Sequence, residues 1–436
     1  MSSVKGKKLL ILGGASQHCK VVEAAKRLGV ETYVADYLPS APAKDMADHS
    51  YQINVTETER LAELCRAERI DGVISGWLDF CQVPYQRLCE AAGLPCYGTR
   101  EQFDILTDKL KFKNLCLDYG VGTIPFASGT TEDILEFASR VGYPLQIKPV
   151  DSRGSRGQSI CNQASELVAA IDWAMDNSRS KMIIAEKRII GFEDISVTYY
   201  FQDGRPIIER LSSRILGNEE DGLDGLAVGS ISPAQCADFY VNSVHPRVLK
   251  MLEAIGVTEG PVFFQGFKVD DDILFYDPGR RFPGGDYERS FYSIWGIDLA
   301  EEMVKYALTG SSEGTLSTVP NDAFKLKSNM QIIYDVTLAP GTIHAVNGIE
   351  SIRNLSNVDS INLRYKSGDI VADDCDVCRR FAEINYTSST LDEAAAISRL
   401  IRERISVIDG SGSGMVISPF SEEINNYRER LRGQIG

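Results

Sequence analysis

The first hundred residues alternate between short apolar runs and segments with helical spacing. The runs have the length of buried strands, at Lys8–Leu12, Thr32–Ala35 and Gly72–Ser75, and the amphipathic segments are Val21–Leu28, Leu61–Ala67 and Leu88–Ala92. Strands that alternate with helices favour a doubly wound, parallel sheet. The pattern therefore predicts an N-terminal α/β domain over residues 1–105.

The middle of the chain reads as a second α/β region followed by hairpins. Expected helices are Phe103–Tyr119, Glu132–Val141, Ser165–Asp176 and Val248–Ile255, and expected strands are Pro144–Lys148 and Met182–Glu186. Two hairpins are predicted, Ile195–Phe201 with Pro206–Leu211 and Val262–Val269 with Ile273–Tyr276. The polar, glycine-bearing segment Gly217–Ala234 is predicted to be a loop that closes over a site.

The last part of the chain reads as β-rich. Expected strands are Met330–Leu338, Gly341–Val346, Val358–Tyr365 and Ile370–Ala372, followed by a helix at Leu391–Ile405. Ser311–Val319 is the preferred linker. We expect a central domain at 106–320, with a smaller subdomain at about 115–190, and a C-terminal α+β domain at 321–436.

Composition narrows the class of protein. The 436 residues are 43% hydrophobic and 25% charged with a net charge of -15, which is typical of a globular chain and unsuited to nucleic acid or anionic membranes. No apolar run approaches a membrane span. The ten cysteines read as reduced thiols, and the single Cys375-x-x-Cys378 pair is weak evidence for metal or redox chemistry. We predict a cytoplasmic protein with neither a nucleic-acid nor a membrane partner.

The glycines after the first strand invite a dinucleotide interpretation, which we disfavour. "GGASQHCKVV" starts at Gly13, but the third glycine of the dinucleotide fingerprint is missing, because His18 or Cys19 stands there. Asp36 would be the ribose acid in that interpretation. A tight turn onto a helix N-terminus needs only the first two glycines.

A loop rich in Gly, Ser and Arg follows the strand that ends at Lys148. A lysine at a strand end can contact phosphate oxygens, and loop N–H groups between glycines can surround them. The P-loop pattern is absent, so a glycine-rich turn without ligand is an equal alternative. The loop residues with this potential are Ser152, Gly154, Ser155, Arg156 and Gly157.

Two further segments carry suitable chemistry. Glu186 and Lys187 end a predicted strand, and Glu193 follows. Gln265 and Asp277 lie on paired strands, where their oxygens can hold Mg²⁺ together with phosphates and water. After Asp277 come the adjacent guanidinium groups Arg280 and Arg281 and the pair Gly284-Gly285, which suit a carboxylate or phosphoryl group.

In order and spacing, these motifs resemble the ATP-grasp superfamily, and most of all its carboxylate–amine ligase and carbamoyl-phosphate-synthase-like branch. The resemblance covers nearly the whole chain. It rests on Thr107–Lys109, Ile147–Gly157, Ala185–Glu193 and Phe275–Gly285. It implies an ATP-grasp fold between the N-terminal α/β domain and the C-terminal α+β domain.

The resemblance also implies roles for single residues. Lys109 and Lys148 would contact ATP phosphates, with the glycine-rich loop closing over them, and Glu193 would hold the ribose. The adenine would be read by Glu186 and the backbone after it, at Lys187 and Ile189. Magnesium, one or two ions and with Mn²⁺ as a substitute, would be carried by Gln265 and Asp277. The transferred phosphoryl group would face Arg281, with Arg280 and Lys148 beside it.

Two departures from the family pattern concern the metal. Position 265 is usually an acid and is Gln here, and the asparagine expected two residues after Asp277 is Gly279. Both departures bear on the second magnesium ion. They keep open a nucleotide-binding regulatory protein without catalysis.

The implied function is an ATP-dependent ligase that activates a small carboxylic acid, such as an amino acid, as an acyl phosphate and couples it to an amine. A bicarbonate-using carboxylase or carbamoyl-phosphate-type enzyme is the alternative within the fold. A homodimer is expected from similar proteins. Weaker substrate candidates share a place at predicted strand ends or beside the long loop: Ser16, His18, Trp77, Asp79, Arg214, Gly284 and Gly285. For His18 a structural role is the commoner alternative.

Overall fold

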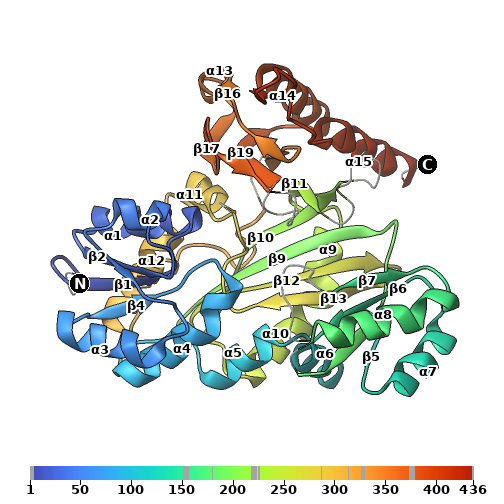
Figure 1. Ribbon diagram of the computed structural model, residues 1–436, viewed down its shortest axis with the longest axis horizontal. Coiled ribbons are helices and arrows are strands. Elements are labelled where there is room, and N and C mark those ends of the chain that lie inside the picture. Colours follow the sequence, from blue (N-terminus) through green and yellow to red (C-terminus); the bar gives the residue numbers. More distant parts are fainter. Residues whose placement is uncertain are drawn as a thin grey trace.

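The computed structural model shows a compact N-terminal lobe, a long central sheet, a small outlying subdomain and a C-terminal layer (Figure 1). In the part of the chain that it describes, no helix is long and apolar enough to cross a membrane. The described residues are 4–150, 157–178, 180–217, 223, 226–285, 287–312, 314–325, 329–372 and 379–434, the last without side chains from 428 onward.

The N-terminal lobe contains a parallel sheet of four strands in the order β3-β2-β1-β4, which confirms the predicted α/β class. The edge strand β3 was not predicted because its HSYQ sequence is mostly exposed and lacks an apolar face. The strands are β1 (Lys8–Leu12), β2 (Glu31–Asp36), β3 (His49–Gln52) and β4 (Gly72–Ile74). The helices are α1 (Cys19–Arg27), α2 (Pro42–Met46), α3 (Thr58–Glu68) and α4 (Asp79–Ala92), with the 3-10 turn Ser16–His18 before α1.

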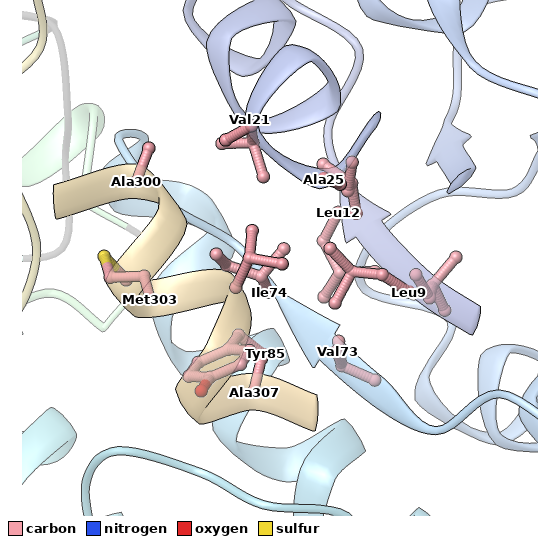
Figure 2. Close-up of a cluster of buried hydrophobic side chains, with 14 of the residues drawn as sticks. Leu9, Leu12, Val21, Ala25, Val73, Ile74, Tyr85, Ala300, Met303 and Ala307 are labelled. Carbon is pink, nitrogen blue, oxygen red and sulfur yellow. The ribbon is translucent and has the colours of Figure 1, made fainter. Parts of the chain in front are cut away.

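Helix α12 (Leu299–Thr309) comes from far along the sequence and completes the core of this lobe. Figure 2 shows its Ala300, Met303 and Ala307 facing side chains of β1, β4 and α1. Gly72 of β4 lies so close to the Ala307 carbonyl that a Cβ there would overlap it. The core of the N-terminal lobe therefore includes residues from the predicted central domain. Helix α11 (Arg289–Trp295) precedes α12.

A small four-stranded sheet forms the outlying subdomain at the lower right of Figure 1. Its strand order is β5-β8-β6-β7, and two helices pack on it around an aliphatic core. The strands are β5 (Phe126–Ser128), β6 (Leu145–Pro149), β7 (Ser159–Cys161) and β8 (Ile183–Lys187), and the helices are α7 (Thr131–Val141) and α8 (Ala164–Asp176).

The single helix predicted over Phe103–Tyr119 was wrong, because the chain forms two helices, α5 (Arg100–Thr107) and α6 (Lys109–Asp118). Asp108 adopts an extended conformation between them, and its carboxylate accepts from the N–H groups of Leu110 and Lys111. This is an N-cap, so Lys109 is the first residue of α6.

An antiparallel sheet of eight strands runs through the centre in the order β13-β12-β9-β10-β11-β14-β19-β17. It joins the central region to the C-terminal layer without interruption. Its strands are β9 (Glu193–Gln202), β10 (Arg205–Leu216), β11 (Ala227–Ser232), β12 (Gly260–Val269), β13 (Asp272–Gly279), β14 (Met330–Thr337), β17 (Val358–Leu363) and β19 (Arg380–Ser388).

The prediction of one long loop over Gly217–Ala234 was wrong for its second half. Ala227–Ser232 is the fully buried strand β11, inserted between β10 and β14. Its serines gave it a polar sequence, but Ser230 accepts a hydrogen bond from the buried Arg210. A polar side chain can be buried when it has such a partner.

The remaining elements cover the ends and faces of the central sheet. The predicted strand Gly341–Val346 is two short strands that pair with different partners, β15 with β18 and β16 with β20. The elements are α9 (Ala237–Phe239), the π-helical turn Tyr240–Val244, α10 (His245–Ala254), β15 (Gly341–Thr342), β16 (Ala345–Asn347), α13 (Ile349–Arg353), β18 (Ile370–Val371), α14 (Leu391–Arg404), β20 (Ser406–Ile408) and α15 (Phe420–Gln434).

Candidate nucleotide site

A cavity of about 460 Å³ lies where the small subdomain meets the central sheet. That volume is in the range of pockets for small ligands. Segments far apart in the sequence form its wall: the end of β8 and the loop after it, strands β9, β10, β12 and β13, and helix α15. The lining residues are Ile124, Gln146, Glu186, Lys187, Arg188, Ile189, Ile190, Gly191, Phe192, Glu193, Asp194, Arg214, Leu216, Gly217, Gln235, Phe267, Tyr276, Glu423 and Tyr427.

A cluster of lysines and carboxylates adjoins the cavity. Lys109 Nζ lies 3.1 Å from Asp277 Oδ1, and both side chains are partly exposed. Lys148 forms an ion pair with Oε2 of Glu186, and Lys113 Nζ lies 3.0 Å from Oε1 of the same carboxylate. The structure thus brings Lys109, Lys148, Glu186 and Asp277 together from four segments.

The pKa values in this cluster follow from burial and from the opposite charges. Burial lowers the pKa of Lys148 to about 8, although Glu186 pulls it upward. Burial would raise the pKa of Glu186, but Lys148 and Lys113 outweigh it and lower that pKa to about 2. Asp277 raises the pKa of Lys109. At neutral pH the cluster therefore holds an ionised Glu186 between cations.

The glycine-rich loop can be followed only at its end. Ser152, Gly154, Ser155 and Arg156 lie outside the described residues. Gly157 has φ +73°, and a Cβ on it would lie 2.5 Å from the Cβ of Asn177. Glycine is therefore required there by conformation and by space.

The segment predicted to contact adenine and ribose lines the cavity. The side chain of Lys187 donates to the carbonyl of Tyr143 at 2.6 Å. Glu193 Oε1 accepts from Ser213 Oγ at 2.5 Å and from the Gln235 N–H at 2.8 Å. The Glu186 carboxylate faces two lysines, and the residues that follow it, Lys187, Arg188 and Ile189, also line the cavity.

The predicted metal pair is directly opposed across two strands. Gln265 of β12 and Asp277 of β13 are register partners. A Cβ at Gly279 would overlap the ring of Phe263, so this position has no room for the family's asparagine. Within the described ranges, no group of three or more His, Cys, Asp or Glu could hold a metal ion. Oxygen atoms from Gln265 and Asp277 nevertheless fit Mg²⁺ if phosphate and water complete its shell.

Arg281 lies at the border between β13 and the N-terminal lobe. Its Nε donates to Asp79 Oδ1 at 2.5 Å, its Nη1 donates to the Phe282 carbonyl at 2.7 Å, and its guanidinium stacks on Phe263 at 4.7 Å. Asp79 is 53% exposed, so this ion pair has one side open to solvent.

Arg280 was predicted to be catalytic, and the structure places its side chain in the interior. Its side chain is fully buried and stacks on the ring of Tyr97. Its guanidinium donates to the carbonyls of Pro261, Tyr97 and Glu259. Since all these acceptors are backbone groups in the interior, Arg280 connects β12, β13 and the N-terminal lobe and presents no group to a ligand.

Two of the weaker substrate candidates are also interior residues. His18 is completely buried against Gly13 and Ser75, and burial lowers its pKa to about 4. Trp77 is 1% exposed, stacks on Phe282 and lies 3.3 Å from Glu288 Oε2. Both were proposed from their place at strand ends, which says nothing about the direction of a side chain.

Ser16, Gly284 and Gly285 surround the junction between the lobes. Ser16 is half-buried in the turn before α1, and Gly284 is also half-buried. Gly285 has φ +143°, and a Cβ there would lie 2.6 Å from Glu383 Oε2. The backbone at Gly285 therefore approaches the C-terminal layer more closely than any side chain would allow.

Arg214 lines the cavity together with residues that sequence reasoning missed. Its Nη1 donates to Asp194 Oδ2 at 2.9 Å and also contacts the hydroxyl of Tyr276. Burial raises the pKa of Asp194 to about 6 despite Arg214. The distant Tyr427 of α15 lies 2.9 Å from Ser213 Oγ. No local sequence signal could have placed Tyr427 here.

Comparison with protein families agrees with this geometry. Residues 108–202 match the carbamoyl-phosphate synthase L chain ATP-binding domain, and residues 9–78 match the PylC-like N-terminal domain. A formate-dependent phosphoribosylglycinamide formyltransferase of Prochlorococcus marinus is 30% identical over 187 residues, covering 42% of this chain and 48% of the relative. The chain spans about half the length of the first such curated relatives it matches.

Solved structures match over nearly the whole chain. An L-amino acid ligase from Bacillus licheniformis has a TM-score of 0.75 at 18% identity and covers 93% of this chain and 99% of the ligase. A biotin carboxylase from Campylobacter jejuni has a TM-score of 0.76 at 17% identity and covers 98% of both chains. Together with the ATP-binding match, these comparisons confirm the predicted ATP-grasp fold.

Proposed function

We propose that this chain, which has the ATP-grasp fold, is an ATP- and Mg²⁺-dependent ligase that forms a C–N bond. A small carboxylic acid is activated as an acyl phosphate and then coupled to an amine, with release of ADP and phosphate. The observation that carries the proposal is the lysine–carboxylate cluster that adjoins the cavity through Glu186, with Lys148 on Glu186 and Lys109 on Asp277, which opposes Gln265.

ATP takes the cavity with its base at the backbone of 187–189 and its ribose at Glu193. Its phosphates meet Lys148 and Lys109, which exchange their carboxylate partners for phosphate oxygens. Gln265 and Asp277 would hold a single Mg²⁺, which would supply further neutralisation of the phosphate charge. The absence of space at Gly279 favours one ion rather than two.

Phosphoryl transfer depends on positioning and on neutralising charge, because the transferred group does little covalent chemistry with the protein. An oxygen of the carboxylate attacks the γ-phosphorus, and ADP leaves. The nitrogen of the amine then attacks the acyl carbon, and phosphate leaves. Arg281 is suited to hold the acid and the transferred group, because its guanidinium is fixed by Asp79 and Phe263 and it follows Asp277 by four residues.

An amine that carries a phosphate is the first class to test. The names of the curated relatives include a phosphorylated ribosyl glycinamide and formate. This chain has buried arginines beyond Gly285, where Arg380 Nε lies 3.0 Å from Asp335 Oδ1. Among the described residues, the Nε atoms of Arg289 and Arg364 are buried and have no hydrogen-bond partner, and guanidinium groups suit an anionic group.

The experiment is a phosphate-release screen with purified protein, ATP and Mg²⁺ against arrays of acids and amines. The acids include formate, amino acids and bicarbonate, and the amines include phosphorylated ones. Mass spectrometry of the positive wells identifies the product. An amide with stoichiometric ADP and phosphate supports the ligase, and dependence on bicarbonate alone supports a carboxylase. ATP binding without release from any pair would leave only a regulatory nucleotide-binding protein.

A further inference from the structure

Lys113 is a buried cation that none of the roles above uses. It lies one helical turn after Lys109 on α6, and its side chain has no exposed surface. Moving an ammonium group out of water costs several kcal/mol unless it is paired. Burial accordingly lowers the pKa of Lys113. A fully buried lysine in this place needs a reason beyond packing.

The contacts of Lys113 reach across the junction between the central sheet and the small subdomain. Its helix packs in the core beneath the sheet through Phe112 and Cys116. Its Nζ lies 3.0 Å from Glu186 Oε1, which belongs to β8 of the subdomain. The same Nζ donates to Thr123 Oγ1 at 3.3 Å, in the segment that connects the two parts.

Glu186 is shared between two lysines, one on each oxygen. Lys113 contacts Oε1 and Lys148 contacts Oε2. Without Lys113, Lys148 would be the one remaining partner of the two that contact the buried carboxylate, and Lys148 would be held more tightly. With Lys113, the cluster of Lys109, Lys113, Lys148, Glu186 and Asp277 has three cations against two anions. The surplus positive charge suits a polyphosphate.

We propose that Lys113 is a positioning residue for nucleotide binding. From α6 it holds the Glu186 carboxylate of β8, so that Lys148 can leave Glu186 and bind a phosphate oxygen instead. The inference rests on the proposed ATP site and adds a residue to it. Lys113 itself does not touch the nucleotide, because it lies behind Glu186 and is completely buried. Its effect passes through Glu186 to Lys148.

The test measures binding of ADP and of adenosine to the full chain by calorimetry, with no acid or amine present. In Lys113→Met, the Kd for ADP is expected to rise about tenfold, which corresponds to about 1.4 kcal/mol, because Lys148 then stays paired with Glu186. Adenosine, which has no phosphate, is expected to keep its wild-type affinity. Lys113→Arg retains the cation and is expected to bind ADP within about threefold of wild type.

The matched control is Lys111→Met, which removes an exposed lysine from the same helix. Its affinity for ADP is expected to stay within about twofold of wild type, because an exposed charge is screened by water and salt. An equal loss of adenosine and ADP binding in Lys113→Met would mean a purely structural role and would overturn the proposal. An unchanged affinity for ADP would overturn it as well.

The pH dependence of ADP binding gives an independent readout. Lys148 faces Glu186 from β8 and Lys109 and Lys113 from α6, and ADP affinity is expected to fall above pH 8 as Lys148 loses its proton. Removing Lys113 takes away a neighbouring cation, so this alkaline limb is expected to move to higher pH in Lys113→Met. A limb that stays in place would contradict the coupling.

A double variant keeps the proposal testable if Lys113→Met fails to fold. Lys113→Met with Glu186→Gln removes the buried cation and the charge that it balances. Lys148 is then unpaired, and ADP affinity is expected to return to within about threefold of wild type. No recovery in a folded double variant would overturn the inference. If wild type itself does not bind ADP, the proposed nucleotide site fails first, which separates the two outcomes.

Discussion

The lysine cluster at the cavity and the arginine pair after β13 use buried charge in opposite ways. In the cluster, Lys109 and Lys148 are paired with carboxylate side chains, which a phosphate can replace. In the arginine pair, Arg280 is held by three backbone carbonyls, which nothing replaces, and its neighbour Arg281 is held by the exposed Asp79. The chemical nature of the partner, rather than the burial of the cation, separates a binding group from a structural one.

The largest expected effect is that of Arg281→Ala on turnover. Removing a positioned charge that meets the transferred group should lower phosphate release by about 10²–10³-fold or more. The affinity for ATP should stay nearly unchanged, since the lysines hold the phosphates. Single-turnover phosphate release and an ATP binding titration check this. A large loss of ATP affinity would mean that Arg281 binds the nucleotide rather than the transferred group.

Arg280→Met makes the matching change one residue earlier and should act on stability. The variant leaves three interior carbonyls without their donor, and breaking such a buried charged network costs about 3–5 kcal/mol. Thermal unfolding should show a clear drop in Tm, while the folded fraction keeps its activity per molecule. A variant with wild-type Tm and no turnover would show that Arg280 is a catalytic group after all.

Gln265→Glu should strengthen the metal site by a smaller amount. It adds a second carboxylate opposite Asp277, and magnesium prefers charged oxygen ligands. The Mg²⁺ concentration for half-maximal activity should fall by about tenfold, an effect of one charge in a partly exposed site. A magnesium titration of ATP turnover measures it, with Gln265→Ala as the matched loss. If the Mg²⁺ requirement of both variants equals that of wild type, the metal does not bind at Gln265.

The smallest expected effect is on stability in acid. The pKa of Glu186 is lowered to about 2 in the fold, below its ordinary value of 4.5. Its contribution to stability is therefore complete above pH 4.5 and is lost as the pH falls through 2. Denaturant midpoints between pH 6 and pH 3 should decline less in Glu186→Gln than in wild type. Parallel declines would mean that the carboxylate is not held by its lysines.

Local sequence was sufficient to predict the structure where a pattern repeats along one segment. Apolar strands between amphipathic helices predicted the parallel sheet, and the resemblance of the motifs around Lys148 and Asp277 to a known family implied the ATP-grasp fold. The hairpin itself was foreseeable from its short turn, but that turn alone would oppose Gln265 to Tyr276. A β-bulge between Gln265 and Gly266 shifts the register so that Gln265 faces Asp277. Lys113, four residues after Lys109, could have been found from helical spacing.

The features that could not be predicted depend on residues that are far apart in the sequence. The sequence around Ala227–Ser232 does not predict a buried strand. Its Ser230 can be buried because it accepts a hydrogen bond from Arg210, which lies on a neighbouring strand. Helix α12 completes a core formed more than two hundred residues earlier, which Figure 2 shows at Met303 and Ile74. Arg280 and Arg281 have the same side chain in the same motif, and only their partners in the folded chain differ.

The sequence by itself determined the class of the fold, the elements around the motifs and the kind of chemistry that the charged residues can do. These properties follow from periodicity and residue type, which act within a few residues of one another. Only the tertiary structure decided that His18, Trp77 and Arg280 are interior groups and that Lys113 shares Glu186 with Lys148. The reason is that desolvation and pairing depend on which distant groups pack together, and a charge takes its role from them.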